Sequence, residues 1–122
     1  MYDSSFNTGD GNDIITGNSS DGGFSIVNTG FMDTGGGDDI ITGNQTGEGS
    51  DSIHYKGFGL LNGNGSSLGG FMDTGDGNDT ITGISNAFVG IGLGNDNNIN
   101  AGNGNDIITG TGKLWYPQQR YH

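Results

Sequence analysis

The sequence predicts an all-β fold, a parallel β-roll or β-solenoid of about four coils. A glycine-rich turn motif recurs along the chain, and its copies fall at a period of about 27 residues. Self-similarity at such a period is typical of solenoids, in which each repeat stacks on the one before it. In addition, no stretch has the apolar spacing of an amphipathic helix.

The repeated unit is clearest in residues 74–83, which read TGDGNDTITG, and near copies occupy 8–17, 34–43 and 101–110. Each copy contains G-x-G-x-D, followed after one residue by Ile. Glycines at alternate positions permit positive φ and a close approach of neighbouring backbone. The Asp adds a carboxylate where we expect backbone carbonyls to point inward. The unit therefore predicts an oxygen-lined turn that leads into a short strand.

The spacing of G-x-G-x-D predicts how the coils are built. Six copies match the motif, and degenerate copies stand at 63–67, where Ser67 replaces the Asp, and near 21–23. The starts form two series, one at residues 9, 35, 63 and 92 and the other at about 21, 47, 75 and 102. We therefore expect each coil to carry two glycine turns, 10 to 12 residues apart.

This register predicts two columns of stacked Asp side chains. The uninterrupted column contains Asp51, Asp79 and Asp106. The other column is interrupted by Ser67 and contains Asp13, Asp39 and Asp96. We expect the first column to matter most, because its three Asp-bearing turns are uninterrupted.

Alternation along the strands predicts which side chains face the interior, because successive side chains point to opposite faces. The position two residues after the Asp is Ile in five of the six copies and is expected inside; it holds Ile15, Ile41, Ile53, Ile81 and Ile108. The next position is expected outside and holds Thr16, Thr42, Thr82 and Thr109.

Composition excludes several classes of protein. Glycine accounts for 28 of 122 residues and hydrophobic residues for only 29%, too few for an ordinary globular core. The formal charge of −11 repels nucleic acid and calls for cations, a basic partner or disorder. Cysteine is absent, so neither disulfides nor thiolate metal sites are expected. No apolar run is long enough to span a membrane, and the first residues lack the features of a secretory signal.

The repeated G-x-G-x-D-x-Ile resembles the glycine-rich nonapeptide of the RTX (repeats-in-toxin, haemolysin-type) family over most of residues 7–110. The family's first Gly is Thr or Ala here, and the units are not spaced at strict intervals of nine. The resemblance implies a parallel β-roll with several Ca²⁺ ions in its turns. It also implies secretion to the extracellular space or cell surface. Secretion through an uncleaved C-terminal signal would be compatible with first residues that lack the features of a secretory signal.

The resemblance assigns metal-binding positions residue by residue. The carboxylates are Asp13, Asp39, Asp51, Asp79, Asp96 and Asp106. The glycines whose backbone could help are Gly9, Gly11, Gly35, Gly37, Gly47, Gly49, Gly75, Gly77, Gly102 and Gly104. The competing interpretation is that these Asp residues only make Asx-turns.

Catalysis is not expected. Residues 65–69 match G-x-S-x-G, but that motif needs a strand-to-helix turn, and here it lies inside a degenerate repeat. The two histidines, His54 and His122, have no evident partner. The repeated carboxylates favour metal sites over an acid/base pair.

The chain divides into a solenoid at 1–112 and a tail at 113–122, which holds the only Trp and the only Pro. We expect the tail to cap the last coil or to contact another subunit. The predicted function is a secreted, calcium-stabilised structural protein that self-associates through its coil ends and tail into a homo-oligomer, filament or surface layer. The alternatives are a monomeric ice-binding, glycan-binding or adhesin module, and a folding or secretion module of a larger RTX protein.

Overall fold

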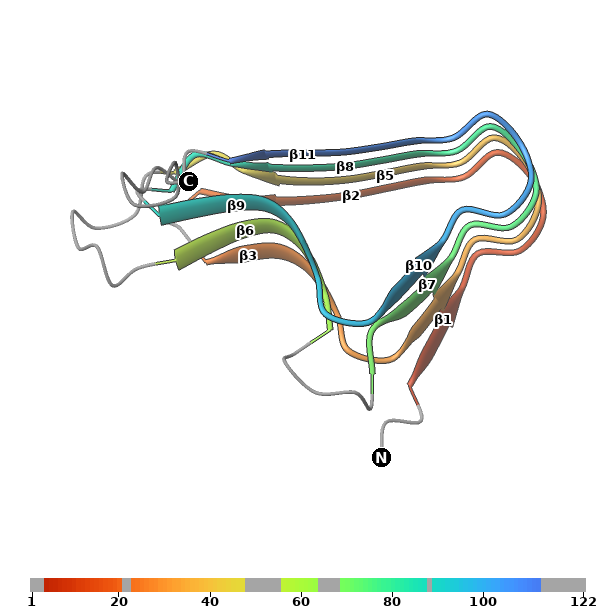
Figure 1. Cartoon of the computed structure of the whole chain (residues 1–122), viewed down its shortest axis with the longest axis horizontal. Helices are drawn as coiled ribbons and strands as arrows, with labels where there is room; N and C mark the ends of the chain where they lie inside the picture. The colour runs from red at the N-terminus through yellow and green to blue at the C-terminus, as the bar shows by residue number, and fades with distance from the viewer. Residues whose placement is uncertain (1–3, 21–22, 48–55, 64–68, 88, 113–122) are drawn as a thin grey trace, which may run out of the picture.

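The computed structural model describes residues 4–20, 23–47, 56–63, 69–87 and 89–112, and it confirms an all-β solenoid (Figure 1). The described residues form eleven strands and no helix. The strands are β1 (Ser5–Asn7), β2 (Ile14–Ser19), β3 (Phe24–Asn28), β4 (Phe31–Asp33), β5 (Ile40–Gln45), β6 (Lys56–Asn62), β7 (Phe71–Asp73), β8 (Thr80–Ser85), β9 (Val89–Asn95), β10 (Asn98–Asn100) and β11 (Ile107–Gly112).

The strands build three sheets, each made of parallel strands, and these sheets enclose a roughly three-sided cross-section (Figure 1). Sheet A has the order β1-β4-β7-β10, sheet B the order β2-β5-β8-β11, and sheet C the order β3-β6-β9. Each coil contributes one strand to each sheet. The described chain therefore makes three complete coils and two strands of a fourth, close to the four predicted.

The coils differ in length, which corrects the predicted even period. Equivalent residues of successive coils lie 26, then 40, then 27 residues apart. Residues 48–55 and 64–68, outside the described ranges, fall within the long step. The predicted series through residues 63 and 92 is therefore wrong, and Gly92 lies inside strand β9 rather than in a turn. Backbone pairing fixes the register of a solenoid, and a coil can absorb extra residues without changing it.

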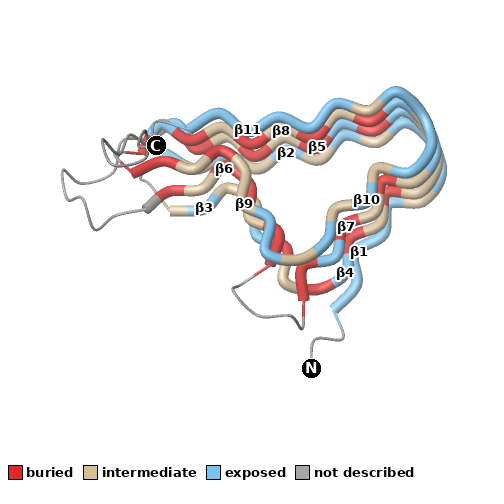
Figure 2. The backbone as a smooth tube through the Cα atoms, viewed as in Figure 1, coloured by how far each residue is buried: buried red, intermediate tan, exposed pale blue. Residues whose placement is uncertain are grey.

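The predicted inside and outside faces of sheet B are confirmed where the structure describes them. Ile15, Ile41, Ile81 and Ile108 pair in one row across the sheet, and Ile41 and Ile81 are completely buried (Figure 2). The outward row consists of Thr16, Thr42, Thr82 and Thr109. Ile53 lies outside the described residues.

The apolar core is small and occupies the middle of the cross-section. It consists of Met32, Ile41, Leu60, Met72 and Ile81. Sheet A supplies the two methionines, sheet B the two isoleucines and sheet C the leucine, so one cluster joins all three sheets.

Polar side chains replace apolar packing at the corner between sheets C and A. The Nδ2 atom of Asn28 donates to Asn62 Oδ1 at 2.8 Å, and Asn62 Nδ2 donates to Asn95 Oδ1, also at 2.8 Å. Asn28 and Asn62 are buried, and their amides also bind backbone carbonyls of sheet A. This asparagine ladder holds sheet C against sheet A, and the sequence analysis did not foresee it.

Sheets B and C approach closely at pairs of glycines, where backbone meets backbone. A Cβ atom added to Gly43 would collide with the backbone carbonyl of Gly59, and one added to Gly83 with that of Gly92. Gly17 faces the backbone of Ser25 in the same way. The last glycine of the first three T-G units is thus required by the contact between the sheets, since any side chain would force them apart.

We predict that Gly43→Ala destabilises the fold by about 1–3 kcal/mol or more, because the added methyl group overpacks a backbone contact. Thermal or urea unfolding followed by circular dichroism measures the loss.

Gly36→Ala is the matched control, because a Cβ there would have no heavy atom closer than 3.8 Å and the backbone does not adopt positive φ. It should leave stability unchanged within about 0.5 kcal/mol. Equal stability of the two variants would refute the tight contact between sheets B and C.

Candidate metal centre

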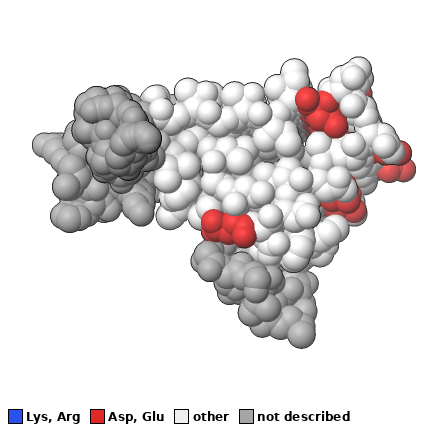
Figure 3. Space-filling view, in the orientation of Figure 1, with Lys and Arg blue, Asp and Glu red and all other residues white. Residues whose placement is uncertain are grey.

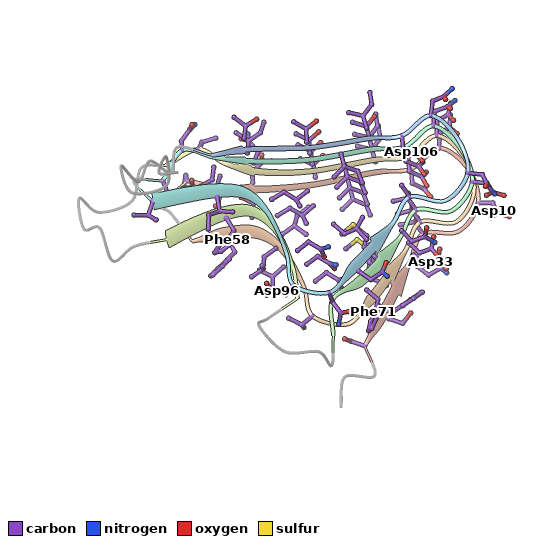
Figure 4. The ribbon with its side chains drawn as sticks, in the orientation of Figure 1. Asp10, Asp33, Phe58, Phe71, Asp96 and Asp106 are labelled. Carbon is purple, nitrogen blue, oxygen red and sulfur yellow. The ribbon has the colours of Figure 1, made fainter. Side chains whose placement is uncertain are left out.

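The four near copies of the repeated unit stack on one another at the corner between sheets A and B (Figure 4). Their turns contain the glycine pairs Gly9 and Gly11, Gly35 and Gly37, Gly75 and Gly77, and Gly102 and Gly104, all with positive φ. A hydrogen bond from the second glycine of each turn joins it to the next coil, for example Gly37 N to Asp76 O at 2.8 Å. The predicted turn geometry is therefore present at this corner, and most residues of the predicted turns at 47–51 and 63–67 lie outside the described ranges.

Four aspartates form a single column along the inside of this corner: Asp13, Asp39, Asp79 and Asp106. The Oδ1 atom of Asp39 accepts a hydrogen bond from Asp13 N at 2.8 Å. Asp79 Oδ1 accepts from Asp39 N at 2.9 Å, and Asp106 Oδ1 from Asp79 N at 3.0 Å. The carboxylates of Asp39, Asp79 and Asp106 thus each hold the turn of the preceding coil.

This column corrects the predicted register. Asp79 and Asp106 continue the column of Asp13 and Asp39, whereas the sequence analysis had placed them above Asp51. The reason is the 40-residue step between Asp39 and Asp79, which an assumed constant period cannot accommodate.

The second oxygen of three of these four carboxylates is buried without a hydrogen-bond partner. The Oδ2 atoms of Asp13, Asp39 and Asp79 are buried and accept no hydrogen bond. Asp39 and Asp79 are each only 1% exposed. A buried polar atom without a partner costs about 1–3 kcal/mol, and more when it carries charge. The column therefore offers oxygens that a cation would satisfy.

The donor set fits a hard cation better than a transition metal. In the described part of the chain, no three His, Cys, Asp or Glu side chains gather in the arrangement of a metal site. An ion here would need carboxylates of adjacent coils together with backbone carbonyls of the glycine turns. Ca²⁺ accepts this mixture, whereas structural Zn²⁺ sites use Cys and His.

A second set of polar side chains fastens the outside of the same turns. Asn12 Oδ1 accepts from Asp38 N at 2.8 Å, Asp38 Oδ1 from Asn78 N at 2.8 Å, and Asn78 Oδ1 from Asn105 N at 2.9 Å. These bonds are not Asx-turns, because each runs to a backbone N–H group of the next coil and not to one two residues along the chain.

Asp33 and Asp73, the last residues of strands β4 and β7 in sheet A, accept hydrogen bonds from the glycine turns that follow them. Each accepts a hydrogen bond at 2.9 Å from the first glycine of the turn, Gly35 or Gly75. The sequence analysis missed both residues. The repeated F-M-D-T-G could have revealed them, because an Asp two residues before a glycine is the spacing of an Asx-turn.

The remaining predicted metal residues lie elsewhere. Asp96 is exposed beyond the end of β9, near Gly63 at the corner between sheets C and A, and does not join the column. Gly47 follows β5 and has an ordinary φ. Gly49 and Asp51 lie outside the described residues, as do both histidines and Ser67.

Acidic side chains concentrate around the corner between sheets A and B. Figure 3 shows separate acidic patches along this edge and one patch at the corner between sheets C and A. The outward residues of the turns include Asp10, Asp38 and Asp76, so the edge carries charge outside as well as inside. A cation would therefore be attracted to this edge of the solenoid.

Comparisons with protein-family models, curated proteins and solved structures find no match to this chain. Within the described ranges, no helix has the length and apolar character needed to cross a membrane.

We predict that Asp79→Ala destabilises the protein by about 1–3 kcal/mol, because it removes the acceptor for the Asp39 N–H and leaves that buried group without a partner. Asp96→Ala, at an exposed position, should change stability by less than about 0.5 kcal/mol.

Urea unfolding of both variants, repeated with and without calcium, makes this comparison. Equal losses from the two variants would show that the column at the corner between sheets A and B does not carry the stability assigned to it.

Proposed function

We propose that this protein is a secreted, calcium-stabilised structural solenoid that associates with further copies through its coil ends. The observation that carries the proposal is the column of four aspartates, three of which have a buried oxygen without a hydrogen-bond partner. The resemblance of the turns to RTX repeats supports both calcium and secretion. No catalytic role is proposed.

Calcium would be held between successive coils of the column. The residues that would hold it are Asp13, Asp39, Asp79 and Asp106, with backbone carbonyls of the glycine turns. Binding would satisfy the unpartnered Oδ2 atoms and offset part of the formal charge of −11. A ligand that binds only the folded state stabilises it by about 2.7 kcal/mol per site at a concentration 100 times its Kd.

We predict that the chain is disordered in chelator and folds when millimolar Ca²⁺ is added. The small core cannot offset chain entropy and repulsion between carboxylates, so metal affinity becomes folding free energy. Far-UV circular dichroism during a calcium titration measures the transition. A full β spectrum in chelator would contradict the prediction.

A pair of Asp→Asn variants localises the effect. Asp39→Asn keeps an oxygen for the Asp13 N–H but removes the buried charge, so the variant should gain less stability from calcium than the wild type. Asp10→Asn, at an exposed position in the turn, should keep the wild-type gain. Equal gains in both variants would place the ion outside the column.

The two ends of the described solenoid expose residues that are buried within it. Phe6 is 48% exposed in the first coil, although Met32 and Met72 in the same row of sheet A are buried. Ile108 is 49% exposed in the last coil, whereas Ile41 and Ile81 are completely buried. A further coil stacked on either end would cover these positions.

The polar ladders also continue across such a stack. Along the column, the backbone N–H of Asp13, Asp39 and Asp79 donates to the carboxylate of the Asp in the next coil. By the same pattern, the backbone N–H of Asp106 would donate to Asp13 of a second copy. Likewise, Asn105 Oδ1 would accept from Asn12 N of that copy. Such a contact is head-to-tail and generates a filament when it does not close into a ring. The predicted participation of residues 113–122 concerns residues outside the described ranges.

We predict that the wild type sediments as oligomers whose mass rises with protein concentration in Ca²⁺, and that Phe6→Glu shifts it toward monomer. A charge at the end of the core row opposes burial against another copy.

Ile40→Glu is the control, because Ile40 is exposed on the outer face of the middle strand β5 and not at a coil end. It should leave the association unchanged. A wild type that stays monomeric at high concentration would contradict self-association, and equal loss in both variants would contradict association through the ends.

A further inference from the structure

The outer face of sheet A contains a groove that the calcium proposal does not use. The groove has a volume of about 480 Å³ and runs over β7 and β10. Its floor lies at Met72 and Ile99, whose side chains pack in or against the core. The outward residues Phe71, Asp73, Asn98 and Asn100 stand around it, and Phe31 of β4 also lines it. Figure 4 shows Phe71 and Asp33 on this outer side of the sheet.

Phe71 gives the groove an apolar wall. Its side chain is 41% exposed, and its neighbour on β10 is the smaller Asn98. The outward neighbour of Phe71 on its own strand is Asp73, roughly 6.6 Å further along. An apolar ring and a carboxylate therefore stand on either side of a space about two residues wide.

The polar groups around the groove retain unused hydrogen-bonding capacity. Asp73 Oδ1 accepts from Gly75 N at 2.9 Å, while its Oδ2 has no donor among the described residues. Asn100 Oδ1 accepts from Gly102 N at 3.1 Å, while its Nδ2 has no acceptor there. The Asn98 side chain forms no hydrogen bond in the described ranges. The groove thus presents free donors and a free acceptor together.

The preceding coil provides an internal contrast. Phe31 and Asp33 are the equivalents of Phe71 and Asp73, with the same F-M-D sequence. In that coil both carboxylate oxygens are engaged, because Asp33 Oδ1 accepts from Gly35 N and Oδ2 accepts from Asn7 Nδ2 at 3.2 Å. The unused capacity is therefore specific to Asp73.

We propose that this groove binds a neutral pyranose unit of a glycan. A sugar ring presents an apolar C–H face that can pack on Phe71, and its hydroxyls both donate and accept, as Asp73, Asn98 and Asn100 require. An anionic ligand would be repelled by Asp73 and by the formal charge of −11. A cation would leave the amide donors unused.

The proposal of sugar binding in the groove and the proposal of calcium binding in the Asp column can be refuted independently of each other. The column lies inside the corner between sheets A and B, whereas the groove lies on the outer face of sheet A. Loss of calcium binding would appear as unfolding, and loss of sugar binding as an unchanged fold without ligand-induced shifts.

The test uses ¹⁵N-labelled full-length protein under conditions where its spectrum shows it folded. Cellohexaose, laminarihexaose, maltohexaose and mannohexaose are added separately at millimolar concentration. We expect at least one of them to shift the amide signals of residues 71–73 and 98–100. We expect Phe71→Ala to weaken that binding about tenfold, the effect of losing roughly 1.4 kcal/mol of contact.

Two matched controls separate recognition from loss of structure. Asp73→Asn should weaken binding, whereas Asp33→Asn should not, because both oxygens of Asp33 already serve the protein. Phe24→Ala removes an exposed ring from sheet C and should leave binding unchanged. The absence of shifts with all four sugars, or equal weakening by Asp33→Asn and Asp73→Asn, would overturn the proposal. Shifts of the same signals by polylysine but by no sugar would also overturn it.

Discussion

The ladder of carboxylates at the corner between sheets A and B reinforces the register that backbone pairing sets along the solenoid. Asp39, Asp79 and Asp106 each accept the backbone N–H of the equivalent Asp in the preceding coil, so a coil that slipped by one residue would lose this bond and turn its Ile row outward. The same arrangement buries three oxygens that have no hydrogen-bond partner. The same carboxylates therefore make the stacking specific and carry the cost of buried charge. A bound cation would offset that cost in the folded state.

Close backbone packing at glycine residues allows this fold to form with a small apolar core. At the corner between sheets A and B, positive φ lets four turns stack closely, and between sheets B and C the missing side chains let backbone meet backbone. Side chains fill only the wider part of the cross-section, where five buried apolar residues suffice. The remaining corner is closed by buried asparagines. The low hydrophobic content of the chain, 29%, thus reflects a structure that relies on backbone contacts and polar ladders.

Features that depend on the spacing of residues within one repeat could be predicted from the sequence. Features that depend on the spacing between successive coils could not. The inward Ile41 and outward Thr42 follow from the two-residue period of a strand, and the turn glycines follow from their own motif. The column of Asp79 could not be derived, because a constant period has no place for the long second coil. The asparagine ladder was missed for a related reason: Asn28, Asn62 and Asn95 lie 34 and 33 residues apart in a chain rich in asparagine, and only the folded corner brings them together.

The ends of the carboxylate column connect the two halves of the proposed function. Within the described chain, Asp13 and Asp106 each have a stacking neighbour on one side only. If calcium lies between successive coils, a second copy stacked head-to-tail would place Asp106 beside the next Asp13 and create one more position of the same kind. The ion would then bind the assembled state better than the free ends, and by linkage calcium would favour assembly as much as assembly favours calcium. A folding cofactor and an assembly signal would be the same ion, because both act on one column.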